Sequence, residues 1–144
     1  MKLRLIGLIV VSLSLAAEDT KKADEAAKQI EGAWQGVSLE QDGNKNDDAN
    51  NFTVEIKHGK YELKVGDETT GKGKLKLDPA KKPHALDIMV EEGANSGQTQ
   101  LGIYEIKDGM LKICFAQPDK PRPSEFSAKE GSGNTLVVLK RRKP

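Results

Sequence analysis

Two adjacent runs of alternating apolar and polar residues constrain the fold of this chain more than any other feature. Every second residue is apolar from 52 to 57 and again from 60 to 65, and His58-Gly59 separates the two runs. Successive side chains of a β-strand point to opposite faces, so the pattern predicts two strands that each bury one face. A two-residue connection that contains glycine fits a tight hairpin turn. The pattern therefore predicts an antiparallel hairpin over residues 52–65.

Similar patterns predict strands through the rest of the chain. Asp108-Gly109 is the strongest hairpin signal, with one expected strand on each side of it. Lysines occupy one face of residues 69–77, and glycines on the other face permit the bending that a closed sheet requires. Residues 42–51 are polar and are expected to form a hairpin loop. The further strands that we expect are residues 69–77, 86–90, 101–107, 110–116, 124–128 and 135–141.

The number of strands and the short connections between them indicate the fold class. Parallel pairing needs long crossover connections, which this pattern does not provide, so the sheet is expected to be antiparallel. Such a meander either closes into a barrel or folds into a two-layer sandwich. We favour the barrel, because closure removes exposed strand edges. The predicted fold class is all-β: an antiparallel up-and-down barrel of eight or nine short strands with a short N-terminal helix.

The N-terminal segment is typical of a secretory signal peptide. Lys2 and Arg4 precede an apolar run of 11 residues, Leu5–Leu15, whereas a membrane-spanning helix needs roughly 20. Small residues follow the run, and cleavage after either Ala16 or Ala17 fits. We therefore expect a secreted or periplasmic protein with no membrane anchor. The predicted division of the chain is a signal peptide at 1–17, a short helical leader at 18–31 and a barrel domain at 32–144.

The composition argues against catalysis, metal binding and nucleic-acid binding. A formal net charge of +1 provides no basic field for a phosphate backbone, so we expect no nucleic-acid partner. The single cysteine, Cys114, excludes an intrachain disulfide and leaves either a free thiol or a cross-link between chains. No catalytic constellation is visible in the sequence beside His58 or His84. We therefore expect a protein that is not an enzyme and that binds no metal and no cofactor.

A family resemblance begins at the first expected strand. Gly32-Ala33-Trp34 is similar to the Gly-x-Trp signature of lipocalins. Further blocks extend the match, namely Val37–Glu40, Lys76–Pro79, Leu101–Glu105, Cys114–Ala116, Arg122–Phe126 and Leu136–Arg141. From about Ile30 to Arg142 the chain resembles a small lipocalin-like domain family of unknown function that is abundant in planctomycete bacteria. Ala33 stands where that family usually has threonine.

The resemblance implies an up-and-down barrel and an exported location, and it brings no catalytic residues with it. In lipocalins the signature tryptophan closes one end of the barrel, so Trp34 is the expected barrel-closing residue. Arg141 or Arg142, near the end of the last strand, is expected to lie over the indole face as a cation–π partner.

The predicted barrel interior is the candidate binding site. Its lining is apolar, with a tyrosine hydroxyl as the expected polar contact, so it suits a small apolar molecule. The alternative is a barrel filled by its own side chains, which acts through its outer surface as a structural or protein-interaction module of the cell envelope. The predicted ligand-binding residues are Phe52, Val54, Ile56, Tyr61, Leu63, Leu75, Leu86, Ile88, Tyr104, Ile113 and Phe115.

Overall fold

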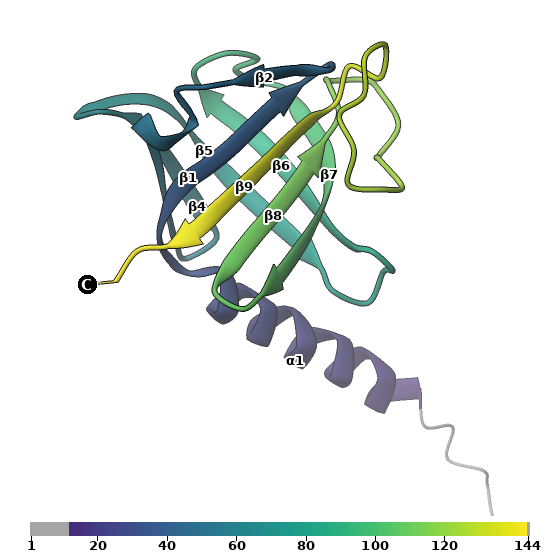
Figure 1. Cartoon of the computed structure of the whole chain (residues 1–144). Helices are drawn as coiled ribbons and strands as arrows, with labels where there is room; N and C mark the ends of the chain where they lie inside the picture. The colour runs from purple at the N-terminus through teal and green to yellow at the C-terminus, as the bar shows by residue number, and fades with distance from the viewer. Residues whose placement is uncertain (1–11, 144) are drawn as a thin grey trace, which may run out of the picture.

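The computed structural model describes residues 12–143, which form one α-helix, nine β-strands and one turn of 3-10 helix. The helix α1 runs away from one end of a rounded sheet, and the strands follow one another around that sheet (Figure 1). The elements are α1 (Ser12–Ile30), β1 (Gly32–Gln41), β2 (Asn44–Asn46), the 3-10 turn η1 (Ala49–Asn51), β3 (Phe52–Lys57), β4 (Lys60–Val65), β5 (Glu68–Asp78), β6 (His84–Glu92), β7 (Thr99–Lys107), β8 (Met110–Phe115) and β9 (Thr135–Arg141).

The sheet closes into a barrel, which confirms the predicted fold class. Strands β3 to β9 pair in chain order, and β1 pairs with β3 on one side and β9 on the other, always antiparallel. Eight strands therefore form the wall, and β2 pairs with β1 outside it. Strand β1 pairs with β9 along one edge through residues 34–41. On its other edge it pairs with β3 through residues 32–35 and with β2 through residues 39–41. The bulge between Gly36 and Ser38 lies between these two parts of β1.

The hairpin turns have the backbone geometry that their sequences predict. His58 and Gly59 have φ values of 53° and 73°, and Asp108 and Gly109 have values of 53° and 75°. Two successive positive φ angles define the turn whose twist matches that of paired strands. Gly73 is required for a different reason, which is the lack of space for a side chain. A Cβ atom there would overlap the carbonyl oxygen of Met89 and the ring of Tyr61. Glycine at this position allows β5 to bend closely around the interior.

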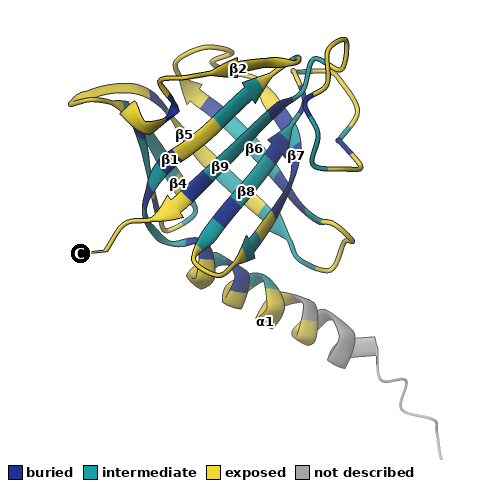
Figure 2. Cartoon of the chain, viewed as in Figure 1, coloured by how far each residue is buried: buried dark blue, intermediate teal, exposed yellow. Residues whose placement is uncertain are grey.

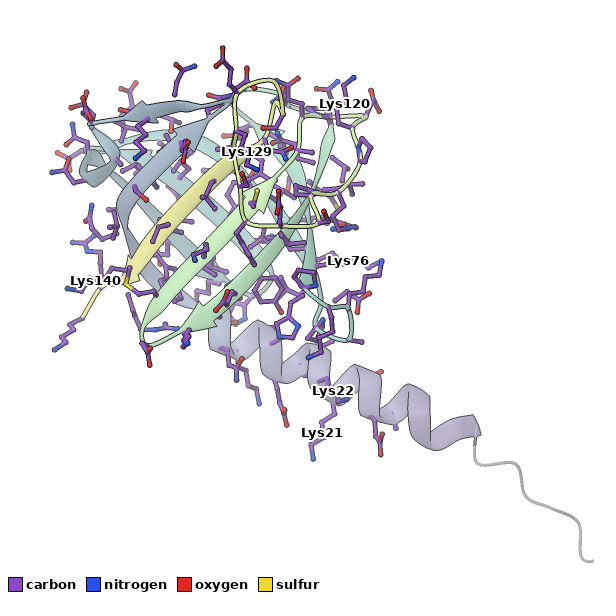
Figure 3. The ribbon with its side chains drawn as sticks, turned by 45° about the vertical axis from the view of Figure 1, so that its right-hand side comes forward. Lys21, Lys22, Lys76, Lys120, Lys129 and Lys140 are labelled. Carbon is purple, nitrogen blue, oxygen red and sulfur yellow. The ribbon has the colours of Figure 1, made fainter. Side chains whose placement is uncertain are left out.

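Burial follows the alternation of the strands. The largest fully buried side chains include Trp34, Ile56, Leu86, Leu111 and Leu139, all of which belong to one core cluster inside the barrel. Figure 2 shows buried positions along β8 and β9 with exposed positions at the strand ends and turns. Charged side chains take the opposite face; the lysines labelled in Figure 3 lie on the outside of the molecule.

One expected strand is absent from the described part of the chain. Residues 124–128 were predicted to be a strand, but the structure places them in a long loop between β8 and β9. The loop lies against the outer face of β7 and β8, where Ile103, Cys114 and Ala128 are buried. Pairing is impossible there because β8 is already bonded to β7 and β9 on its two sides.

The N-terminal and 42–51 predictions are also refined by the structure. Helix α1 begins at Ser12, ahead of the predicted leader at 18–31, and residues 1–11 of the predicted signal peptide lie outside the described residues. The polar segment 42–51 is a hairpin, as expected, but it contains the short strand β2 and the turn η1. Ala49 of η1 is buried in the core cluster, so this segment closes part of the gap between β1 and β3.

Candidate functional site

The end of the barrel next to α1 is closed by Trp34 and Arg141. Trp34 is fully buried, and its indole N–H donates a hydrogen bond of 2.9 Å to the carbonyl oxygen of Ile30. The Arg141 guanidinium lies 4.2 Å from the centre of the indole ring, as a cation–π pair. Arg141 also donates hydrogen bonds to the carbonyl oxygens of Gln29 and Glu31, at 2.6 Å and 2.7 Å. These bonds fasten the C-terminus of α1 to the barrel.

The interior above this floor is lined by apolar side chains that are only half-buried. Strand register places them inside the barrel, where they pack against the core cluster. Ile56, Leu111 and Leu139 lie in the same wall and are fully buried. Other apolar lining side chains keep part of their surface uncovered by the rest of the protein. Six of these half-buried side chains, called here the middle ring, are Val54, Leu63, Leu75, Ile88, Ile113 and Val137.

The structure brings the predicted lining residues to one interior, at different depths. Ten of the eleven belong to the core cluster or pack against it; Phe115 alone is outside that set and is half-buried near the far end of β8. The buried members are Phe52, Ile56, Leu86 and Tyr104. The half-buried members are Val54, Tyr61, Leu63, Leu75, Ile88, Ile113 and Phe115.

Two polar residues of the interior were missed by the sequence analysis. Gln100 and Thr135 are 9 % and 8 % exposed, and they are the buried polar residues of the described chain. Gln100 lies directly opposite Ile88 of the middle ring, and Thr135 lies opposite Phe115. The alternation of the strands could have identified Gln100. It stands at every second position with Gly102 and Tyr104, so its side chain is on the inward face.

Both tyrosines of the interior remain protonated to high pH. Burial, followed by the negative charge of Glu91, raises the pKa of Tyr61 above its usual value of 10.0. Burial, followed by the charge of Asp78, raises the pKa of Tyr104 in the same way. Each phenol therefore presents a neutral hydroxyl to its surroundings at neutral pH.

The barrel end opposite α1 carries a cleft. Its volume is about 630 Å³, and it includes Leu39 and Gln41, which face inward by their register with β9. We call this cleft the rim cleft. None of the middle-ring residues lines this cleft. Its remaining lining is polar, namely Asp42, Asn44, Lys45, Asn46, Asp47, Asp48 and Gln117.

The loop 116–134 forms a separate surface feature. Arg122 donates hydrogen bonds of 2.8 Å to the carbonyl oxygens of Leu86 and Gly102, and pairs with the carboxylate of Asp87 at 2.7 Å. Cys114 lies beneath the loop, where its thiol contacts the carbonyl oxygen of Ser127 at 3.4 Å. A cleft of about 520 Å³ on this loop is lined by loop residues and Asp42, and none of the predicted lining residues belongs to it.

The two histidines and the cysteine contact different neighbours. The exposed His58 imidazole lies 3.9 Å from Glu31, and the His84 ring packs 5.5 Å from Tyr104. Burial raises the pKa of the Cys114 thiol, which keeps it neutral. Within residues 12–143 no His, Cys, Asp and Glu side chains gather in a group that suits a metal ion. Among the described residues no helix has the length and apolar character needed to cross a membrane.

Comparison of the chain with protein-family models, with curated proteins and with solved structures found no match.

Proposed function

We propose that this protein is an exported lipocalin-like barrel that binds a small apolar molecule in its interior. The observation that carries the proposal is the middle ring, whose apolar side chains face inward and remain accessible. Apolar surface facing water is unfavourable by roughly 25 cal/mol per Å², so a ligand that covers it is stabilised in proportion to the area buried. Trp34 closes the floor of the barrel, so a ligand would enter from the end that carries the rim cleft. The signal-like N-terminal sequence supports export.

The proposal is tested by titrating the protein with diphenylhexatriene, a hydrocarbon whose fluorescence rises in apolar surroundings. We expect saturable binding by the unmodified chain. Val54→Phe and Ile113→Phe each add bulk to the middle ring, so each is expected to weaken binding at least tenfold. Urea unfolding of each variant shows that the barrel remains folded.

Val37→Phe is the matched control, because Val37 is 48 % exposed at the β1 bulge and lies outside the middle ring. We expect it to bind the hydrocarbon as the unmodified chain does. Absence of saturable binding, or equal binding by all three variants, would contradict a ligand-binding interior. That result would favour a barrel that acts through its outer surface.

A further inference from the structure

The Gln100 side chain carries a hydrogen-bond acceptor that has no partner among the described residues. The Gln100 side-chain amide nitrogen donates to the carbonyl oxygen of Ala116 at 3.2 Å, which fixes the orientation of the amide. The other end of the amide, Oε1, has no hydrogen bond to any of the residues that the structure describes. No side-chain nitrogen or oxygen among these residues is both fully buried and unpartnered. Oε1 is therefore partly exposed to solvent and not sealed within the protein.

The Gln100 side chain lies on the inward face of β7. Gln100 is paired with Ile88 across β6 and β7, with its side chain on the same face. The residue as a whole is 9 % exposed, so its free oxygen is presented from a buried side chain. Thr135 adds a hydroxyl on the inward face of β9, beside Phe115 of β8. An apolar chamber with a few placed polar groups is the usual form of a site that orients a ligand.

The charges around the site argue against an anionic ligand. The rim cleft contains the carboxylates of Asp42, Asp47 and Asp48 and one ammonium group, that of Lys45. A carboxylate ligand would have to pass these groups and then meet an acceptor oxygen at Gln100. An ionised group buried without a counter-ion is strongly disfavoured, and the middle ring carries no charge.

We propose that the natural ligand is a neutral apolar molecule with one hydroxyl group, which donates its hydrogen bond to Oε1 of Gln100. The hydrocarbon part covers the middle ring. This inference rests on the proposed function and specifies its ligand class. It favours an alcohol over the fatty acid or amine of the same chain length.

The test is displacement of diphenylhexatriene from the full chain by n-decanol, decanoate and decylammonium at neutral pH. We expect the alcohol to compete at least tenfold more tightly than either ion, because only the alcohol avoids burying a charge. This comparison uses the unmodified protein, so it does not depend on the folding of a variant. Equal or tighter binding of either ion would overturn the inference.

Gln100→Leu removes the acceptor while keeping an apolar side chain of similar size. It is expected to weaken decanol binding about 3- to 10-fold relative to diphenylhexatriene binding by the same variant. Gln98→Leu is the matched control, because Gln98 is exposed in the turn before β7. Unchanged decanol binding in Gln100→Leu would overturn the inference and leave the hydrocarbon site intact. Failure of the unmodified chain to bind diphenylhexatriene would overturn both proposals.

Discussion

Arg141 joins three parts of the molecule through one side chain. Its guanidinium stacks on the indole of Trp34 and donates to two carbonyl oxygens at the end of α1. Carbonyl groups in the last turn of a helix have no partner within the helix, and a cation there also interacts favourably with the helix dipole. The arginine therefore stabilises both the floor of the barrel and the attachment of the helix.

Arg141→Ala is expected to lower the free energy of unfolding by about 1–3 kcal/mol, from the lost cation–π contact and hydrogen bonds. Urea unfolding followed by Trp34 fluorescence measures the change. Arg142→Ala is the control, because the contact of Arg142 on the barrel is made by its backbone N–H to Ala33. Equal losses in the two variants would mean that general charge, and not the contact with the indole, is responsible.

At the residue scale, the sequence predicted which side chains face inward, but it did not predict how far each of them is buried. The alternation in residues 52–65 places Val54 and Ile56 on one face, and the register confirms it. It cannot distinguish the half-buried Val54 from the buried Ile56, because depth depends on what the opposite wall contributes. Gln100 was missed for a related reason, since its polar character suggests an exposed position unless the barrel around it is known.

At the scale of elements, the hairpins were predictable and the long loop was not. Each hairpin is specified by local alternation and by a turn such as Asp108-Gly109. The loop 116–134 is positioned by contacts distant in sequence, including Arg122 with Asp87 and the Gly43 N–H with the carbonyl of Ala128. A short strand was predicted at residues 124–128, but barrel closure leaves β8 and β9 no free edge to pair with it.

The attachment of the loop to the barrel can be tested through the Cys114 thiol beneath it. Arg122→Ala removes all three bonds that tie Arg122 to β6 and β7, so the loop is expected to open more often. Alkylation of Cys114 by iodoacetamide, followed by mass spectrometry, should then accelerate at least threefold. In the unmodified chain the buried, neutral thiol should react slowly, because burial raises its pKa.

Lys120→Ala is the control for this loop, because Lys120 is exposed and makes no ion pair in the described chain. Its alkylation rate is expected to match that of the unmodified protein. If Arg122→Ala leaves the rate unchanged as well, the loop is held by its other contacts, such as the bond between Asp42 and the Gly133 N–H.

At the scale of the whole molecule, closure makes the first and last strands of the barrel neighbours. The pairing of β1 with β9 gives every wall strand two partners and removes all free edges of the barrel wall. Strand number and short turns favoured such closure from the sequence. Whether the interior holds a ligand did not follow from them, because the same strands could also enclose a filled core.

The stability of the whole barrel should fall above the pKa of an unfolded tyrosine. Burial raises the pKa of Tyr61 and Tyr104 in the folded state, so between the unfolded and folded values the unfolded chain binds fewer protons. The contribution of the two phenols is therefore fully present below about pH 10 and is lost as the pH rises above it. Urea unfolding between about pH 9 and 11 measures this decline. The double variant Tyr61→Phe and Tyr104→Phe should show a shallower decline, since deprotonation of the lysines is common to both proteins; an identical slope would show that the tyrosines titrate alike in the folded and unfolded chains.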